Sequence, residues 1–331
     1  TFSRTDMSLL GRWWRTIDRW TISAVAALML IGVILILAAS PSVAERYEID
    51  MFHFVNRQFL FLPLALVCML AISMLSSTSV CRLSIMILLS AILLMVLTLI
   101  GGTEIKGATR WVRLGGLSLQ PSEFVKPSLA VVTAWMFATW RINQGFPGHL
   151  VSLGVYITVI ILLLAQPDIG MAILISFVWG IQLFLAGLPM VLVMGIGVFF
   201  IIGGFASYFQ FQHVRERIDR FVDPQNSEAY QVRRSLEAFN NGGIFGRGPG
   251  EGQVKELIPD VHSDFIFAVA GEEFGMIAGL IIIVLFSFIL LRGFIRAFKE
   301  TDMFIQLSVA GLLSQFGLQT IINLASTINL M

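Results

Sequence analysis

Residues 264–291 read DFIFAVAGEEFGMIAGLIIIVLFSFILL, a mostly apolar stretch that carries three carboxylates. A membrane-spanning helix needs about 20 mostly apolar residues, whereas a strand of a membrane barrel alternates over about 10. This stretch is long enough to cross a bilayer with tilt, or to begin outside the apolar core of the membrane. It therefore predicts a transmembrane helix.

The composition of the 331-residue chain agrees with a membrane protein. Hydrophobic residues make up 56% of it and charged residues 13%, against about 25% charged residues in globular proteins. These values exclude a disordered chain, a secreted disulfide scaffold and an ordinary soluble enzyme. The net charge of +1 indicates no nucleic-acid partner, and the two cysteines, Cys68 and Cys81, indicate no disulfide framework and no metal cluster.

Further apolar runs along the chain predict an all-α, polytopic helical membrane protein with nine spans. The runs lie at 21–40, 57–76, 82–100, 122–140, 149–165, 169–187, 189–208, 264–291 and 303–325. The chain is thereby divided into an N-terminal segment 1–20, spans one to seven in 21–208, a large loop 209–263, and spans eight and nine in 264–331.

The N-terminal segment is expected on the cytoplasmic side of the membrane. It carries four arginines beside three tryptophans, which fits the positive-inside rule and interfacial anchoring. Nine of the 22 Lys and Arg then lie inside and 13 outside, so the total count opposes this orientation, while 17 of the 21 acidic residues lie outside. We give the first helix more weight, because long loops translocate largely regardless of their charge. The large loop is then extracytoplasmic.

Charged side chains gather near the outer membrane boundary in residues 107–127, GATRWVRLGGLSLQPSEFVKP. Glu123 and Lys126 are three residues apart and share a helix face. An ion pair that steadies the helix end and a charged wall of a substrate cavity both fit this pattern. Arg110 and Trp111 fit interfacial anchors, and they fit equally a grip on phosphate beside a lipid tail.

Two other motifs mainly predict ordinary structure. Gln166-Pro167-Asp168 joins two apolar runs, and Asp168 is expected to cap a tight turn. Arg217 lies in HVRERIDRFVDP, which fits a solvated helix face, although one arginine there could bind a pyrophosphate bidentately. The glycine-rich stretch 240–252 lacks the Gly-Lys-Ser/Thr ending of a nucleotide-binding loop, which leaves a flexible turn or an anion-binding nest.

Asp264 is the strongest catalytic candidate, because it lies where water meets an apolar segment. Partial desolvation there disfavours the charged carboxylate and makes it a competent general base near neutral pH; a helix cap is the alternative. At 3.6 residues per turn, Glu272 lies about 80° around the helix from Asp264 and Glu273 about 180°. Glu272 is therefore expected to look toward the same cavity and Glu273 toward another helix. Both are expected to have partners or a function.

The motifs quoted above resemble the SEDS family of cell-wall proteins, which includes FtsW, RodA and SpoVE. The matching sequences are GATRWVRLGGLSLQPSEF, QPDIG, YQVRRSLEAFNNGGIFGRGPGEG and LIPDVHSDFIFAVAGEEFG, in family order over nearly the whole chain. EIKGATRW and FAVAGEEFG look more like FtsW than RodA. The resemblance implies the SEDS fold of ten spans, nine of them visible here, with the large catalytic loop between the seventh and eighth.

The resemblance also implies a function at the outer face of the bacterial cytoplasmic membrane. SEDS proteins are peptidoglycan glycosyltransferases that polymerise lipid II into glycan strands. They work with a class B penicillin-binding protein of the FtsI type, and the FtsW-like features imply other divisome proteins as partners at the division site. No nucleic acid is expected.

Site residues follow from the resemblance motif by motif. It implies Asp264 as the catalytic residue, and it implies binding of substrate by the residues of four further motifs. These are Glu123, Lys126, Arg110, Trp111, Arg217 and Glu272. The metal site stays unknown, with a divalent cation, Mg²⁺ or Mn²⁺, as a possible helper.

The implied reaction is an inverting glycosyl transfer with Asp264 as general base and undecaprenyl pyrophosphate as leaving group. A lipid II flippase and a non-catalytic division scaffold are the alternatives. This chain departs from the family at Ser263, Met171 and Val214, and it ends at Met331 before the tenth span that the family leads one to expect.

Overall fold

The computed structural model of the chain describes most of its residues. They are 9–46, 48–101, 103–105, 108–114, 117–143, 145–188, 190–210, 212, 215, 227–258 and 261–328. The chain divides into two compact units. The first unit comprises Thr1–Met74, Ser207–Arg292 and Thr320–Met331, and the second comprises Leu75–Ala206 and Gly293–Gln319.

Each of the nine predicted apolar runs coincides with a helix. These helices are α2 (Arg19–Arg46), α3 (His53–Ser73), α4 (Ser77–Gly101), α5 (Pro121–Ile142), α6 (Gly148–Ala165), α7 (Ile169–Leu185), α8 (Met190–Gln210), α11 (Ile266–Ala297) and α12 (Met303–Thr327). Within the described residues, six of them, α2, α3, α4, α6, α11 and α12, are long and apolar enough to cross a membrane. A multi-pass membrane protein is thereby supported, while the count of nine spans stays a prediction.

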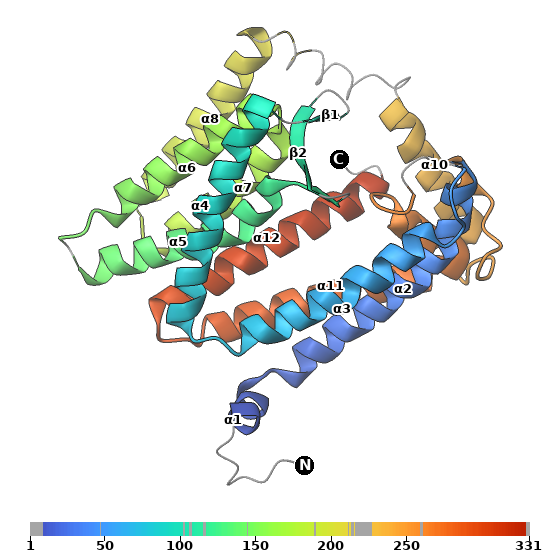
Figure 1. Cartoon of the computed structure of the whole chain (residues 1–331), viewed down its shortest axis with the longest axis horizontal. Helices are drawn as coiled ribbons and strands as arrows, with labels where there is room; N and C mark the ends of the chain where they lie inside the picture. The colour runs from blue at the N-terminus through green and yellow to red at the C-terminus, as the bar shows by residue number, and fades with distance from the viewer. Residues whose placement is uncertain are drawn as a thin grey trace. The chain divides into compact units, whose positions relative to one another are not determined.

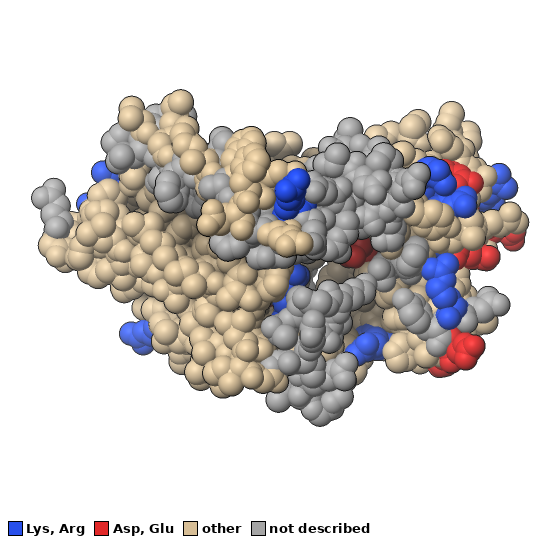
Figure 2. All heavy atoms as spheres, turned by 90° about the horizontal axis from the view of Figure 1, so that it is seen from above, with Lys and Arg blue, Asp and Glu red and all other residues tan. Residues whose placement is uncertain are grey.

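The surfaces of these helices are apolar where a soluble protein would be polar. On α3, Phe59, Leu60, Leu64 and Val67 are all more than half exposed. Figure 2 shows broad tan areas on one face of the molecule, with blue and red side chains only in small groups. Large exposed apolar areas indicate an interaction with lipid or with partner proteins.

The first unit is built around α2, α3 and the larger part of α11. Figure 1 shows α2 and α3 running side by side. The core of this unit joins Leu35, Ala39 and Val43 of α2 to Phe267 and Ala270 of α11. Two helical segments of the loop region 209–263 belong to it, α10 (Ser227–Gly242) and the short 3₁₀ helix η1 (Val254–Leu257).

The N-terminal segment is fastened to this unit by side chains. It contains a short helix, α1 (Leu9–Thr16). The Arg292 guanidinium of α11 donates to both carboxylate oxygens of Asp18, at 2.6 and 2.9 Å, and Trp13 Nε1 donates to Ser73 Oγ at 2.9 Å. The sequence places all four of these residues on the same side of the membrane, so the contacts agree with the predicted path of the chain.

The second unit is built around α5, the helix with the largest buried share of its residues. Its buried side chains pack with those of α4, α6 and α7 (Figure 1). Phe137 of α5, Met95 of α4, Leu163 of α6 and Trp179 of α7 lie in this core. The helix begins at Pro121, where proline is tolerated because the first amides of a helix have no intrahelical partner.

A small antiparallel sheet departs from the all-helical prediction. Its strands are β1 (Thr103–Ile105), β2 (Ala108–Leu114) and β3 (Leu117–Leu119), in that order, between α4 and α5. Val112 pairs with Leu119 and Leu114 with Leu117. The three residues of β1 and of β3 are too few to show an alternation, and the seven residues of β2 lie in a glycine-rich stretch that was interpreted as a loop. The sheet sets the position of Arg110 and Trp111, which lie in β2.

Candidate active site

Asp264 lies in the turn that leads into α11, two residues before the helix begins at Ile266. Its neighbours Val261 and Phe265 are buried, at 0% and 7% exposure, and anchor the turn in the core. The Asp264 side chain itself is exposed. The span was predicted to begin at Asp264, and α11 begins two residues later. The carboxylate was expected to be partly desolvated, whereas the Asp264 side chain is exposed in the structure.

Glu123 and Lys126 form the ion pair that their spacing predicts. Lys126 Nζ lies 2.8 Å from Glu123 Oε2, with the lysine side chain 3% exposed and the glutamate 48% exposed. Lys126 Nζ also donates to Gln319 Oε1 of α12 at 3.0 Å. The lysine is therefore held by one charged and one neutral acceptor at the buried face of α5.

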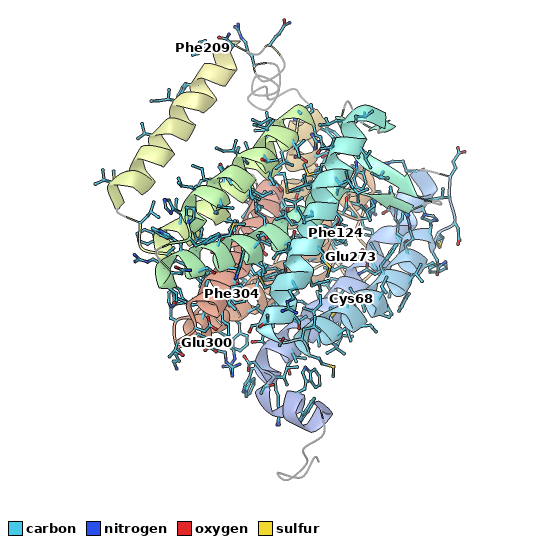
Figure 3. The ribbon with its side chains drawn as sticks, turned by 60° about the vertical axis from the view of Figure 1, so that its left-hand side comes forward. Cys68, Phe124, Phe209, Glu273, Glu300 and Phe304 are labelled. Carbon is cyan, nitrogen blue, oxygen red and sulfur yellow. The ribbon has the colours of Figure 1, made fainter. Side chains whose placement is uncertain are left out.

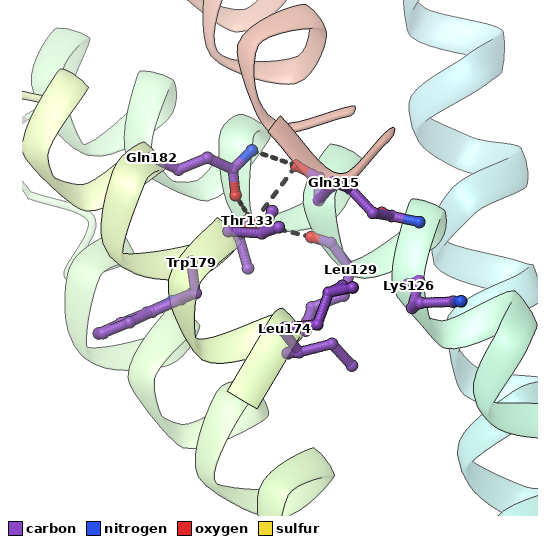
Figure 4. Close-up of a pocket in the computed structure, with 10 residues that line it drawn as sticks. Lys126, Leu129, Thr133, Leu174, Trp179, Gln182 and Gln315 are labelled. Atoms are coloured by element: carbon purple, nitrogen blue, oxygen red, sulfur yellow. Dashed lines mark hydrogen bonds between the residues drawn. The ribbon is translucent and has the colours of Figure 1, made fainter. Parts of the chain in front are cut away.

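The start of α5 also borders a small cavity of the second unit. Figure 4 shows Thr133 and Gln182 facing one another beside Gln315, while the amino group of Lys126 points away from them. The cavity volume is about 10 Å³, roughly the room that one water molecule needs. This space is too small for a lipid-linked sugar, so it is not a substrate pocket.

Arg110 is tied to the turn that precedes α7. Its Nε donates to Gln166 O at 3.1 Å, its Nη2 donates to Pro167 O, and its Nη1 lies 3.5 Å from Asp168 Oδ1. Asp168 caps α7, because its side chain accepts from Met171 N. The predicted capped turn is confirmed. The contact with Arg110 was not predicted, and the role of Arg110 as an interfacial anchor or as a phosphate ligand stays a prediction.

The glutamate pair of α11 is completely buried, at 0% exposure for Glu272 and 1% for Glu273. The Glu272 carboxylate accepts from the backbone amides of Gln253, Val254 and Lys255 at 2.8 to 2.9 Å. The expected partners of Glu272 are thereby found, and its orientation toward the cavity of Asp264 stays a prediction. The first amides of η1 need an acceptor, and Glu272 provides it.

Glu273 faces another helical segment, as predicted, and pairs there with a lysine of η1. Its Oε1 accepts from Lys255 Nζ, which also donates to Ala38 O of α2 at 3.0 Å. Figure 3 shows the labelled Glu273 among the helices, whereas Glu300 lies on an exposed loop. We call Asn241, Lys255, Glu272 and Glu273 the carboxylate clamp. Burying two charged glutamates in an apolar helix is unfavourable, so the sequence predicted that both have partners. It did not identify Lys255 as one of them.

The predictions for Arg217 and for a divalent cation are not tested by the described residues. Arg217 and Val214 lie outside the described residues. Among the residues that are described, no group of three or more His, Cys, Asp or Glu side chains is arranged to hold a metal ion. We therefore assign no ligands to a divalent cation.

Comparison with known proteins decides the family. A family model for FtsW, RodA and SpoVE, described as cell cycle protein, matches residues 19–331. The chain belongs to this family. The resemblance to SEDS proteins is thereby confirmed, and with it a helical fold of the SEDS type.

Relatives in this family share most of the chain. The probable peptidoglycan glycosyltransferase FtsW of Caulobacter vibrioides is 42% identical over 330 residues, which are 99% of this chain and 85% of that protein. A chain of a peptidoglycan synthase complex that coordinates polymerization and crosslinking has a TM-score of 0.76 and 25% identity, covering 95% of this chain and 88% of its own. The rod shape determining protein RodA of Thermus thermophilus has a TM-score of 0.65 and 24% identity, covering 94% and 85%.

Proposed function

We propose that this FtsW-family chain is a peptidoglycan glycosyltransferase that polymerises lipid II at the outer face of the cytoplasmic membrane during cell division. The observation that carries the proposal is the exposed Asp264 on a turn that buried Val261 and Phe265 anchor in the core, in the motif SDFIF. The name of the Caulobacter relative, at 42% identity, supports the activity. The described apolar helices support a multi-pass location in the membrane.

The proposed reaction is a single displacement. Asp264 takes the proton from the C4 hydroxyl of the acceptor GlcNAc, and the freed oxygen attacks C1 of the donor MurNAc. A C4–O–C1 bond forms, the bond between C1 and the pyrophosphate oxygen breaks, and undecaprenyl pyrophosphate leaves with the electron pair. One exposed carboxylate suffices, because the step needs one base and no covalent intermediate.

The remaining site residues have proposed roles in binding. Glu123, Trp111 and Arg217 contact the substrate, with Arg217 stabilising the negative charge that develops on the pyrophosphate. Lys126, which is buried and bound to Glu123 and Gln319, holds Glu123 in place. Arg110 acts differently, because its guanidinium is already engaged by the turn at Asp168. We assign it to holding β2, and thus Trp111, in place.

The proposed topology and partners complete this function. The N-terminus is cytoplasmic and the region 209–263 extracytoplasmic, as the arginines of the N-terminal segment predict. The partner is a class B penicillin-binding protein that cross-links the glycan strand, at the division site. The likeness to a chain of a synthase complex that coordinates polymerization and crosslinking supports this choice.

The test is polymerisation of lipid II by the purified chain with its cognate penicillin-binding protein. Asp264→Asn is expected to lower the rate by at least about 100-fold, because general base catalysis contributes about 10²–10⁴-fold. Asp50→Asn, the same change at an exposed aspartate of the first unit, is the matched control and should retain full activity. Full activity of Asp264→Asn would overturn the base assignment. Translocation of lipid II across liposomes without chain growth would favour the flippase instead.

A further inference from the structure

Glu272, the central carboxylate of the clamp, accepts four hydrogen bonds. Glu272 Oε1 accepts from the amides of Gln253 at 2.9 Å and Val254 at 2.8 Å and from Asn241 Nδ2 at 3.0 Å, while Oε2 accepts from the Lys255 amide at 2.9 Å. Hydrogen bonds to an ionised acceptor are roughly twice as strong as neutral ones. Both carboxylate oxygens of Glu272 are therefore bonded within the protein, and they hold the backbone of the segment 253–255 in place.

The backbone of α11 is joined to the same region by direct contact. Arg247 N donates to Glu272 O and Gly248 N to Glu273 O, both at 3.0 Å. A Cβ on Gly246, where φ is +81°, would lie 2.2 Å from Glu273 O. Only glycine permits both this conformation and this approach. The glycine-rich stretch is thus a docking surface for α11 rather than a free turn.

Glu273 fastens the other side of the same segment. Lys255 Nζ donates to Glu273 Oε1 and, at 3.0 Å, to Ala38 O of α2. The lysine and glutamate side chains are 5% and 0% exposed. One lysine thus joins η1 to both α11 and α2 within the first unit.

The segment that the clamp holds precedes Asp264 in the sequence, and residues 259–260 between the two lie outside the described part of the chain. Ile258, which follows η1, and Val261 are 1% and 0% exposed in the core, and Asp264 stands three residues beyond Val261. On its other side, Asp264 is joined to Glu272 by the start of α11, where Ala268 and Ala270 are fully buried. The chain before Asp264 is thus held at Lys255 and the chain after it at Glu272 and Glu273, and these three residues contact one another.

We propose that Glu272 is a positioning residue for Asp264: its carboxylate holds the amides of 253–255, and through them the turn that carries the base. The Lys255–Glu273 pair secures the same segment. This inference rests on the proposed function, because it assumes Asp264 to be the base. Glu272 contacts no substrate in this proposal, in contrast to the role that the resemblance implied.

The test is Glu272→Gln in the full chain with its penicillin-binding protein. The change keeps the side-chain shape but removes the charge and turns an NH₂ group toward amides that need an acceptor. We expect kcat to fall by about 100-fold, because a displacement of a catalytic group by about 1 Å can lower the rate by that factor. KM should stay within about twofold of its value in the unmodified chain. Hydrogen–deuterium exchange at the amides of 253–255 should become faster. Glu272→Asp retains the carboxylate, so its kcat and its exchange rate at 253–255 should lie between those of Glu272→Gln and those of the unmodified chain.

Controls separate this inference from the function on which it rests. Glu251→Gln, the same change at an exposed glutamate of the glycine-rich stretch, should leave kcat and exchange unchanged. If Asp264→Asn is inactive and folded Glu272→Gln keeps its kcat, the inference is wrong and the proposed function stands. If Asp264→Asn is fully active, the proposed function fails first. A raised KM at constant kcat would show that Glu272 binds substrate and would overturn the positioning role.

A milder variant covers the case in which Glu272→Gln does not fold. Asn241→Ala removes one of the four donors to Glu272 and leaves the three amides in place. Loss of a hydrogen bond to a charged group corresponds to about a tenfold decrease in kcat if that bond positions the base. A folded Asn241→Ala chain with unchanged kcat and unchanged exchange at 253–255 would contradict the proposal.

Discussion

The carboxylate clamp of the first unit and the amide cluster of the second both bury polar side chains among apolar helices. We define the amide cluster as Thr133, Gln182 and the carbonyls of Ala130 and Leu307. Gln182, at 0% exposure, accepts from Thr133 Oγ1 at 2.7 Å and donates to Ala130 O at 2.7 Å and Leu307 O at 3.1 Å. Neutral groups thereby join α5, α7 and α12, whereas the clamp uses full charges.

The difference follows from what each region has to hold. In the helices of the second unit, the backbone groups are bonded within each helix. The Gln182 amide therefore only adds interhelical hydrogen bonds, and each of these contributes little to the free energy of unfolding. Residues 253–255 have backbone amides without a helical acceptor at the start of η1, and a carboxylate satisfies several of them at once. Charged side chains therefore stabilise the irregular segment 253–255, which precedes Asp264 in the sequence. Neutral side chains join the regular helices of the second unit.

Breaking the charge pair should give the largest loss of stability. Lys255→Met leaves Glu273 buried without its cation, and we expect the free energy of unfolding in detergent micelles to fall by about 3–5 kcal/mol. The measurement is a denaturant titration of the purified chain. Lys255→Met/Glu273→Met, which replaces both charges by apolar groups, should recover most of this loss. A single variant as stable as the unmodified chain would show that the pair does not anchor the segment.

Removing the amide should have a smaller effect and leave the chemistry intact. Gln182→Leu keeps the side-chain bulk and loses three interhelical hydrogen bonds, so we expect a loss of about 1–2 kcal/mol in the same titration. Polymerisation by the folded fraction should stay within about twofold, because the cluster belongs to helix packing and not to the segment before Asp264. A decrease in kcat as large as that of Glu272→Gln would remove the distinction between the two regions.

Local signals in the sequence predicted the helices and one cap. Every apolar run coincides with a helix, because length and hydropathy are properties of a single segment. Asp168 caps α7 as expected, because a cap depends on residues only a few positions away. The sheet at β1–β3 was missed, since its strands are short and the stretch reads as a glycine-rich loop.

Partners that are distant in sequence could not be predicted. Arg110 meets the carbonyl of Gln166, 56 residues away, and Lys255 meets Glu273, 18 residues away. Burial of the glutamates was foreseeable from their place in an apolar run, but a single sequence does not say which cation reaches them. Helical geometry predicted the angle of Glu272 around α11, but it could not identify the amides of 253–255 that pack against its carboxylate.

The smallest effect is expected for the hydroxyl of the amide cluster. Thr133→Val has nearly the same shape and removes the hydroxyl that bonds to Gln182 Oε1 and, within α5, to the carbonyl of Leu129. The buried oxygen of Gln182 then lacks this interhelical bond. Interhelical hydrogen bonds in membrane proteins average about 0.6 kcal/mol, and we expect a loss of that size. Thr158→Val is the matched control, because Thr158 is exposed on α6 and bonds only to the carbonyl of Gly154 in its own helix. Equal losses for the two variants would mean that the Thr133–Gln182 bond adds nothing to helix packing, and the contrast with the carboxylate clamp would then be larger than we infer.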